Sequence, residues 1–285
     1  MFKWLFGSKS KTKELRPTSV GKILILGENC TDVFQYGTSD RICPEAPVPV
    51  FIPGRTTTNS GMAGNVVENV KSLGCTDYEF ISPRTCPIKT RYVDEASNQM
   101  LLRIDENDVV PRISRDDFHT ILGTHYDLVI ISDYHKGYLS LSDIEEIVKV
   151  FPMVFIDSKN PRISNIIPFL GEDSYLKVNE HEYHTAFDTH FFEENPDAIE
   201  RIVITMGSDG AMLDGKIYRS LKIRVRDVAG AGDTFLAALA TKYAETSNID
   251  IAITFANNMA LQVVQQPGVV ACVKNQISPT INLDD

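Results

Sequence analysis

The sequence has 285 residues, 43% of them hydrophobic, and a formal net charge of -10 at pH 7. This length and composition suit one large soluble α/β domain or two small ones. The acidic balance argues against a nucleic-acid-binding protein, because such proteins bind phosphates through clustered Lys and Arg. The five cysteines show no C-x-x-C spacing, so they indicate neither a disulfide framework nor a zinc site and favour the reducing cytoplasm.

The N-terminal residues 1–18 are predicted to form a disordered basic tail. Trp4, Leu5 and Phe6 lie beside several lysines, but this apolar stretch is too short for a secretory signal. A weak interfacial anchor is the alternative interpretation. No apolar run approaches the roughly 20 residues that cross a bilayer, so no transmembrane segment is expected.

Five short apolar runs predict strands at residues 22–26, 127–132, 153–157, 175–179 and 201–205. They are apolar on both faces and separated by helical stretches, which is typical of a doubly wound, mostly parallel sheet flanked by helices, in an α/β fold. Polar residues stand at the C-terminal ends of four of these strands, where open α/β sheets bind ligands. They are Asp133, Asp157, Asn179 and Thr205.

Two segments, at about residues 33–53 and 87–105, break this alternation. They look like strands outside the main sheet, and residues 94–98 are a predicted turn between the two strands of the second segment. We expect the two segments to form a small β lid.

The run of residues 227–239 joins an anion-binding turn to a carboxylate. Gly230 and Gly232 allow a tight turn, and the apolar spacing after them predicts a helix that begins at Asp233 or Thr234. Free N–H groups and the helix dipole at such an N-terminus attract phosphate oxygens. Asp233 would then accept the proton of an attacking hydroxyl in a phosphoryl transfer. The alternative is an Asp that only caps the helix.

This run resembles the C-terminal signature of the ribokinase-like (PfkB) carbohydrate kinases. The resemblance implies an anion hole at Gly230, Ala231 and Gly232, and Asp233 as the catalytic base. It also implies ATP as the phosphoryl donor and Mg²⁺ as a cofactor, and it leaves open whether a monovalent cation assists.

Two further motifs agree with this family in their order along the chain. Residues 177–182 contain its N-x-x-E pattern, which implies that Asn179 and Glu182 hold Mg²⁺ through water; a helix cap and a surface acid are the alternative. Residues 205–210 resemble its T-x-G-x-x-G nucleotide-binding turn. The nucleotide-binding residues that the resemblance implies are Lys159, Asn179, Thr205, Gly207, Gly210 and Asn257.

Within this superfamily the chain looks most like the D-glycero-D-manno-heptose 7-phosphate kinases. The similar segments are residues 41–50 (R-I-S-P-E-A-P-V-P-V in those kinases), 89–91 (K-T-R), 99–105 (Q-Q-L-L-R-I-D), 132–137 (S-D-Y-x-K-G) and 157–159 (D-P-K). The resemblance implies transfer of the γ-phosphoryl group of ATP to the anomeric hydroxyl of a heptose 7-phosphate. The product would be the 1,7-bisphosphate, for nucleotide-heptose and lipopolysaccharide-type glycan synthesis.

The sugar site that this resemblance implies combines hydroxyl-binding and cationic side chains. Asp32 and Asn65 suit hydrogen bonds with sugar hydroxyls, although Asp32 alone could be a turn residue. Lys89, Arg91 and Arg103 offer three cations on the lid, which a 7-phosphate would require; a solvated strand face is the alternative. The whole predicted set is Asp32, Gly61, Asn65, Lys89, Arg91, Arg103, Asp133 and Lys136.

The chain departs from the family pattern in three places. Glu28 replaces the first Asp of G-D-x-x-x-D, and Met62 replaces the second of two glycines before Asn65. Residues 74–87 are too few for the strand and helix that the family usually has there, so we expect that sheet edge to be open or covered by a second subunit.

Lids of this family often pair, which predicts a homodimer through the lid. No H-x-G-H motif of a nucleotidyltransferase is present, so only the kinase step is expected.

Two other functions stay open on the sequence alone. A kinase for another sugar or a nucleoside fits Met62 and the short segment at 74–87. A non-catalytic sugar- or nucleotide-binding descendant is the second, although an idle protein has no physical need for Asp233. A dinucleotide-binding oxidoreductase is excluded, because no G-x-G-x-x-G follows the first strand.

Overall fold

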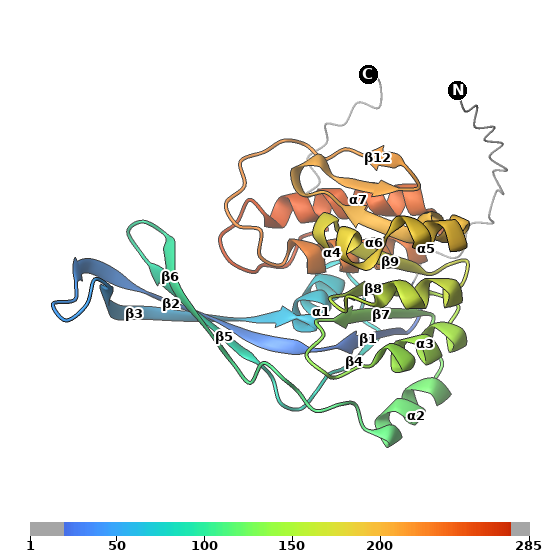
Figure 1. Ribbon diagram of the computed structural model, residues 1–285, viewed down its shortest axis with the longest axis horizontal. Coiled ribbons are helices and arrows are strands. Elements are labelled where there is room, and N and C mark those ends of the chain that lie inside the picture. Colours follow the sequence, from blue (N-terminus) through green and yellow to red (C-terminus); the bar gives the residue numbers. More distant parts are fainter. Residues whose placement is uncertain (1–19, 275–285) are drawn as a thin grey trace.

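The computed structural model describes residues 20–274. The tail predicted at residues 1–18 lies outside the described residues, as do both ends of the domain predicted for residues 19–285. The described chain folds into a main α/β body from which a long β lid projects (Figure 1). No helix of this part of the chain is both long enough and apolar enough to cross a bilayer.

The main sheet confirms the predicted doubly wound, mostly parallel architecture. Its eight strands are β1 (Ile23–Gly27), β4 (Tyr78–Ile81), β7 (Leu128–Asp133), β8 (Val154–Ser158), β9 (Tyr175–Asn179), β10 (Ile202–Thr205), β11 (Ala211–Leu213) and β12 (Lys216–Tyr218). Their order is β12-β11-β10-β9-β8-β7-β1-β4, in which β11 is antiparallel to both of its neighbours. The parallel strands from β9 to β1 all end at the same edge, which carries the predicted polar residues.

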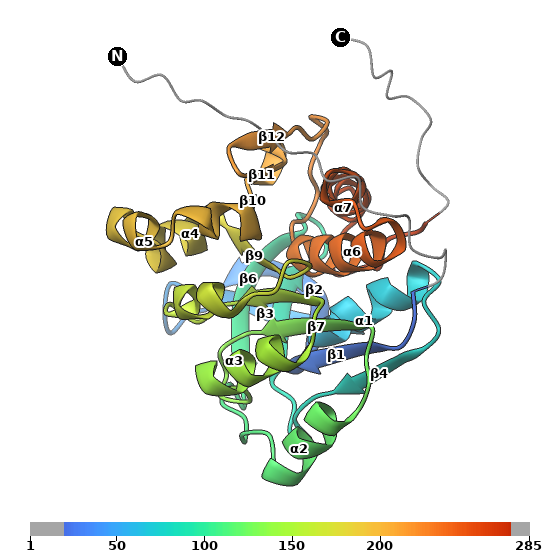
Figure 2. The ribbon, with the colours of Figure 1, turned by 90° about the vertical axis from the view of Figure 1, so that its right-hand side faces the viewer.

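Helices cover both faces of this sheet (Figure 2). One face carries α1 (Ala63–Ser72), α6 (Ala231–Thr246) and α7 (Ile249–Val263). The other carries α2 (Arg115–Gly123), α3 (Leu141–Val150), α4 (Glu180–Ala186), α5 (Thr189–Glu194) and the 3-10 helices η1 (Ile163–Phe169) and η2 (Pro196–Arg201), while a third 3-10 turn, η3 (Gly207–Asp209), follows β10. Alternation along β1 explains the two cores, because Ile23 and Ile25 pack into one and Leu24 and Leu26 into the other.

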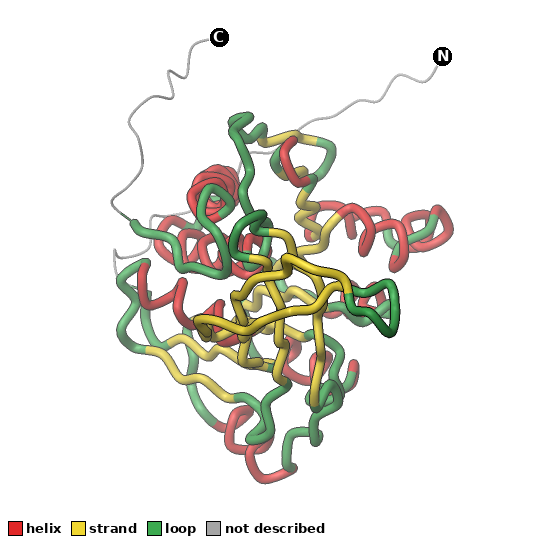
Figure 3. Tube along the Cα trace, turned by 90° about the vertical axis from the view of Figure 1, so that its left-hand side faces the viewer, coloured by secondary structure: helices red, strands yellow, loops and turns green. Residues whose placement is uncertain are grey.

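The β lid is a separate sheet of four strands. They are β2 (Asn29–Ile42), β3 (Pro49–Met62), β5 (Ile88–Asp94) and β6 (Gln99–Glu106), in the order β3-β2-β5-β6. Figure 3 views the molecule from the lid side, with these strands in front of the main body. β2 and β3 run beyond the predicted segment at 33–53, because they continue into the main body, where Asn29 pairs with Met62.

Helix α6 begins earlier than the sequence predicts. Its first residue is Ala231, and its N-cap is Gly230 in the left-handed conformation, with φ of 79°. The expected start at Asp233 or Thr234 is therefore wrong, and so is the alternative that Asp233 caps the helix. A Cβ atom at position 230 would lie 2.6 Å from Nδ2 of Asn65, so both the turn and its neighbour require glycine there.

The segment at residues 74–87 keeps a strand that we expected to be missing. β4 lies there and pairs in parallel with β1 at the edge of the main sheet. The segment contains no helix, so only the helical half of the expected pair is absent from it. The four residues of β4 are half-buried, and no strand within residues 20–274 pairs with its outer edge.

Met62 adopts a backbone conformation that favours glycine. It stands between β3 and α1 with φ of 57° and ψ of -134°, and its side chain is buried. A non-glycine residue in such a region costs about 1–3 kcal/mol. The methionine is therefore held in a strained position by the packing around it.

We expect Met62→Gly to be more stable than Met62→Ala by about 1 kcal/mol or more, because only glycine relieves the positive φ. Both variants lose the buried side chain, which costs about 2–5 kcal/mol for Met to Ala. Thermal unfolding of the two variants beside the parent chain measures the difference. In a relaxed helix or strand Ala is the more stable residue by about 0.5–1 kcal/mol, and that order would contradict the strain.

Candidate active site

Two cavities meet at the N-terminus of α6. The larger has a volume of about 720 Å³ and the smaller about 440 Å³, and four residues line both: Tyr134, Lys159, Gly230 and Asp233. A group bound in either cavity would therefore approach the same carboxylate.

Asp233 is the buried acid at this junction. It stands in the first turn of α6, and only 5% of its surface is exposed to solvent. The hydroxyl of Tyr134 donates to Oδ1 at 2.7 Å, and Nδ2 of Asn65 donates to Oδ2 at 3.1 Å. Burial raises the pKa of Asp233 to about 6, and the two hydrogen bonds limit the rise. Such a carboxylate is ionised at neutral pH and basic enough to take a proton.

The first turn of α6 is also suited to an anion. The turn follows the left-handed Gly230, and the N–H of Ala231 donates to the carbonyl of Val228 at 3.2 Å. The helix N-terminus and the positive charge of Lys177 beside it favour an anion at this position. A Cβ atom on Gly232 would lie 3.2 Å from Nζ of Lys177, so this ammonium lies against the turn. Lys177 is buried and pairs with Asp157 at 2.7 Å.

A chain of ion pairs extends from Lys177 along the floor of the larger cavity. Lys159 pairs with Asp157 at 3.0 Å and with Glu182 at 2.5 Å. Burial alone would raise the pKa of Asp157, but the charges of Lys177 and Lys159 hold it below its ordinary value. Asp157 therefore stays charged and fixes both ammonium groups.

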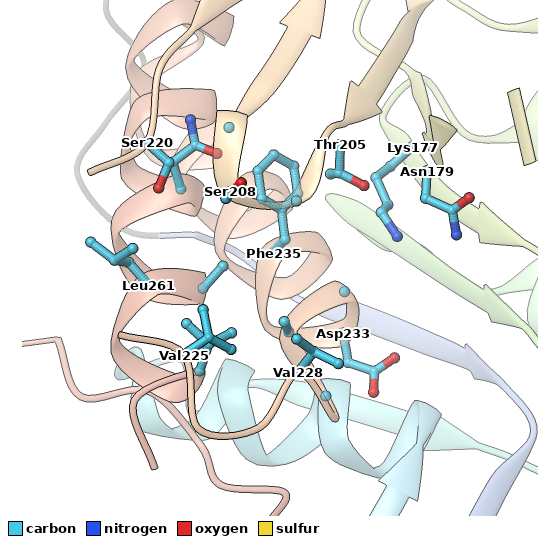
Figure 4. A pocket seen from close by; sticks show the side chains of 18 of the residues that line it. Lys177, Asn179, Thr205, Ser208, Ser220, Val225, Val228, Asp233, Phe235 and Leu261 are labelled. Atoms are coloured by element: carbon cyan, nitrogen blue, oxygen red, sulfur yellow. The ribbon is translucent and has the colours of Figure 1, made fainter. Parts of the chain in front are cut away.

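The larger cavity has a polar and an apolar wall (Figure 4). Asn179 and Thr205 lie near Lys177 on the polar side, whereas Val225 and Leu261 lie on the opposite side. The other predicted nucleotide-binding residues that line this cavity are Lys159, Gly207, Gly210 and Asn257. A flat apolar ring and a polyphosphate fit this division of the walls.

The smaller cavity lies under the lid and is rich in charge. Its predicted lining residues are Asp32, Gly61, Lys89, Arg91, Arg103 and Lys136. Glycine is required at position 61, because a Cβ atom there would lie 2.0 Å from Oδ2 of Asp32.

Most cations of this cavity are already paired with carboxylates. Lys159 pairs with Asp157, as described above. The other pairs are Arg91 with Asp32 at 2.5 Å, Arg103 with Asp105 at 2.7 Å and Lys136 with Asp108 at 2.5 Å. Lys89 is 8% exposed and, among the residues that the structure describes, has no carboxylate within ion-pair distance. Its Nζ lies 5.4 Å from the centre of the Tyr134 ring. A buried ammonium without a carboxylate partner is suited to bind an anionic ligand.

Three predicted site residues lie beside the cavities and do not line them. Asn65 donates a hydrogen bond to Asp233 but does not reach either cavity. Asp133 accepts hydrogen bonds from the N–H of His135 at 2.9 Å and the hydroxyl of Ser158 at 2.5 Å, so it shapes the loop after β7. Glu182 forms a capping box with Asn179 at the start of α4.

Two site residues were not predicted from the sequence: Tyr134, which lines both cavities, and Lys177, which lines the larger one. Tyr134 stands within the quoted segment 132–137, but nothing in the sequence links its hydroxyl to a residue 99 positions away. Lys177 could have been found from the sequence, because it is a charged residue within the otherwise apolar, buried strand β9. A lysine inside such a strand is rarely buried without a charged partner.

The contacts of Glu28 explain why a longer acid replaces the first Asp of the family pattern. Its buried carboxylate accepts hydrogen bonds from the backbone N–H groups of Tyr134 at 2.7 Å, Lys136 at 3.0 Å and Tyr138 at 3.2 Å. Glu28 therefore organises the loop that carries Tyr134 and Lys136 into the cavities.

A helix N-terminus suited to a phosphate, placed between a cavity with an apolar wall and a basic cavity under a β lid, is the arrangement expected of a small-molecule kinase. Residues 113–276 match the sequence profile of the pfkB family carbohydrate kinases, which is more than half of the chain. The chain belongs to this family, and the resemblance found in its motifs is confirmed. It is a phosphotransferase with an alcohol group as acceptor.

The curated relatives include bifunctional proteins. The chain is 28% identical over 304 residues to the "Bifunctional protein HldE" of a Nitratiruptor species, a match that covers 90% of the chain and 64% of that protein. It is 28% identical over 320 residues to the HldE of Helicobacter pylori (strain HPAG1), covering 91% and 68%. The chain thus spans about two thirds of the length of these relatives, and slightly less for the first.

Solved structures agree with the fold. The ribokinase of Thermotoga maritima superposes with a TM-score of 0.63 at 17% identity, covering 88% of this chain and 94% of that one. The phosphofructokinase-2 of Escherichia coli in complex with potassium gives 0.69 at 15% identity, covering 90% and 96%. These matches confirm the ribokinase-like fold.

We expect kcat/KM to fall about tenfold per pH unit below about pH 6, because a catalytic base, the role predicted for Asp233, must be unprotonated to accept a proton. Tyr134→Phe removes a donor to the carboxylate, so its acid limb should lie about one pH unit higher. Tyr126→Phe is the matched control, since it removes a hydroxyl bonded to Glu79 outside both cavities. Steady-state rates between pH 5 and 9 provide the measurement, and coincident limbs in the parent chain and Tyr134→Phe would contradict this role.

Proposed function

We propose that the protein is an ATP-dependent kinase that phosphorylates the anomeric hydroxyl of a heptose 7-phosphate. The observation that carries this proposal is the position of Asp233, buried between a cavity suited to ATP and a basic cavity under the lid. The segments at residues 41–50 and 99–105, which resemble those of the heptose 7-phosphate kinases, support a heptose substrate, and the charge of the smaller cavity supports a phosphorylated one. We further propose that the product enters nucleotide-heptose and lipopolysaccharide-type synthesis.

The transfer would use few groups. The acceptor oxygen attacks the γ-phosphorus, the bond to the β–γ bridging oxygen breaks, and the acceptor proton passes to Asp233. The N–H groups of Gly230 and Gly232 and the charge of Lys177 would stabilise the transferring group. The N–H of Ala231, the third residue of the predicted anion hole, donates to the carbonyl of Val228 at 3.2 Å and would have to leave this acceptor to take part. ADP and the sugar bisphosphate then leave.

The predicted roles in nucleotide binding are part of the proposal. Thr205, Gly207 and Gly210 would follow the phosphates, and Asn257 would lie near the base. Nδ2 of Asn257 already donates to the carbonyl of Tyr218 at 2.8 Å, so it would shape the base pocket through that contact. Lys159 lines both cavities and would reach the donor phosphates.

Mg²⁺ would be held chiefly by the phosphates of ATP. The described residues contain no group of three His, Cys, Asp or Glu side chains that could hold a metal ion. Asn179 and Glu182 bond each other in their capping box, so we propose that they reach the ion through water. Bound there, Mg²⁺ would neutralise phosphate charge. The potassium complex of the Escherichia coli relative supports adding K⁺ to the assay.

In the sugar cavity, Asp32 would accept hydrogen bonds from sugar hydroxyls, and Lys89 would be the principal phosphate ligand. Arg91, Arg103 and Lys136 already have carboxylate partners, whereas Lys89 has none within ion-pair distance in residues 20–274. The paired cations would add charge around the phosphate without leaving their partners.

We also propose a homodimer through the lid in the cytoplasm. Large apolar side chains are exposed on the lid strands, and a second copy would cover them. They are Ile42, Ile52, Met100, Leu102 and Ile104. The five free cysteines and the need for ATP support the cytoplasm. A monomer in light scattering would rule the dimer out.

The function is tested by incubating the pure chain with ATP, Mg²⁺ and a panel of heptose phosphates, other sugar phosphates and nucleosides. We expect ADP release and a bisphosphate product with a heptose 7-phosphate. Turnover only with another acceptor would reject the heptose assignment. The panel includes other acceptors because the buried Met62, in place of the family's glycine, lines the sugar cavity. Absence of turnover with every acceptor would reject the kinase activity proposed for this site.

Asp233→Asn should lose activity and gain stability. Because burial raises the pKa of this carboxyl from 3.8 to about 6, its charge destabilises the fold above pH 6, and this penalty disappears as the pH falls below about 4. The neutral amide should therefore raise the free energy of unfolding at pH 7.5 by up to about 3 kcal/mol. Activity assays and thermal unfolding measure both effects. An active Asp233→Asn would show that another group accepts the proton.

Lys89→Met should raise KM for the phosphorylated acceptor about 10- to 100-fold, since a hydrogen bond to a charged group contributes about 1.5–3 kcal/mol. KM for ATP should not change. Arg55→Met is the matched control, because Arg55 is a lid cation that pairs with Glu95 and does not line the cavity. If the two substitutions raised KM equally, Lys89 would act only through its positive charge and not as a direct ligand of the phosphate.

A further inference from the structure

The amide of Asn65 must point in one direction to support Asp233. Its Nδ2 donates to Oδ2 of Asp233 at 3.1 Å and to the carbonyl of Gly230 at 3.3 Å. If the amide turned by half a rotation, Oδ1 would face a carboxylate oxygen and a carbonyl oxygen. Three acceptors would then meet without a donor, and the ionised form of Asp233 would be disfavoured.

Asn69 fixes this direction from the next turn of α1. Its side chain is fully buried, and its Nδ2 donates to Oδ1 of Asn65 at 3.2 Å and to the backbone carbonyl of Asn65 at 2.8 Å. With Oδ1 of Asn65 occupied by this donor, Nδ2 of Asn65 is left to face Asp233. Asn69 itself lines neither cavity, so it acts through Asn65.

A backbone group fixes Asn69 in turn. The N–H of Cys272, in the segment after α7, donates to Oδ1 of Asn69 at 2.9 Å, and Cys272 is buried. An amide side chain can rotate, but a backbone N–H is always a donor. The direction is therefore set at Cys272 and passed through Asn69 and Asn65 to the carboxylate. The link from Cys272 to Asn69 joins residues 203 positions apart, and the link from Asn65 to Asp233 joins residues 168 positions apart.

We propose that Asn69 is a positioning residue of the phosphoryl transfer, which holds the Asn65 amide so that it donates to Asp233. This inference rests on Asp233 being the proton acceptor, as proposed above. Removal of Asn69 would free the Asn65 amide and weaken one of the two hydrogen bonds that favour the carboxylate.

Other charged or titratable groups also act on Asp233, and an Asn69 variant leaves them in place. They are Tyr134 from the loop after β7, Asp157 from β8, Lys177 from β9 and Cys30 from β2, with Lys159 lining the same two cavities. A shift in the titration of Asp233 in such a variant therefore reports on the amide relay.

The first test follows the Asp233 carboxyl by ¹³C NMR in the full chain, assigned as the aspartate resonance missing from Asp233→Asn. We expect Asn69→Ala to move its titration midpoint upward by about one pH unit. Ser72→Ala is the matched control, because its hydroxyl contacts the carbonyl of Asn69 and the sulfur of Cys272 but not the amides of the relay. Unchanged midpoints in Asn69→Ala, or equal shifts in both variants, would overturn the proposal.

The second test uses the acceptor that supports turnover. In Asn69→Ala the acid limb of kcat/KM should move with the NMR midpoint, so that activity falls several-fold at pH 6.5 and recovers by pH 8.5, with KM for ATP unchanged. If Asn69→Ala does not fold, the nearly isosteric Asn69→Asp keeps the acceptor for Cys272 and removes the donor to Asn65, and it should shift the midpoint in the same direction. An active Asp233→Asn would reject the proposed base, whereas an inactive Asp233→Asn with an unshifted Asn69 variant would reject the relay alone.

Discussion

The active site depends on a carboxylate that is charged although it is buried. Burial opposes the ionised form of Asp233, and two donors, Tyr134 and Asn65, offset part of this cost. One donor comes from the loop after β7 and the other from α1, while the acid itself stands on α6. These three elements meet only when the sheet and the helices on one face are packed. The acidity of Asp233 is therefore a property of the whole main body and not of the Gly-rich turn alone.

Cations in the two cavities are held in place before any ligand binds. Asp157 pairs with both Lys177, which lies against the turn of α6, and Lys159, and acids of the lid fix Arg91 and Arg103. This arrangement reconciles an acidic protein with sites for anions, because each paired ammonium or guanidinium is already oriented and loses little freedom on binding. It also gives each cavity a different character, since most positive charges of the smaller cavity are paired with carboxylates, whereas Lys89 has no such partner within residues 20–274.

Much of this site could be predicted from the sequence, and the failures have physical causes. Apolar runs placed the parallel strands, since burial on both faces leaves a strong pattern, and the glycines placed the anion turn. The start of α6 was missed because a left-handed Gly230 closes the turn before the first strongly apolar residue. Tyr134, Asn69 and Glu28 were missed as parts of the site because their partners are remote in sequence, so no local spacing records the contact. The β4 strand was missed because four half-buried residues carry little periodic signal.

The departures from the family pattern lie around the smaller cavity, the one proposed to bind the acceptor. Glu28 replaces a shorter acid and reaches three backbone N–H groups of the loop that brings Lys136 to this cavity. Met62 fills a strained position in the wall of that cavity, and the shortened segment ends just before the lid strand that carries Lys89. Around the larger cavity, the turn at Gly230, Asp233 and the residues near Asn179 and Thr205 keep the pattern. For the function proposed above, changes confined in this way would alter which hydroxyl compound fits, while the groups proposed to transfer the phosphoryl group keep their arrangement.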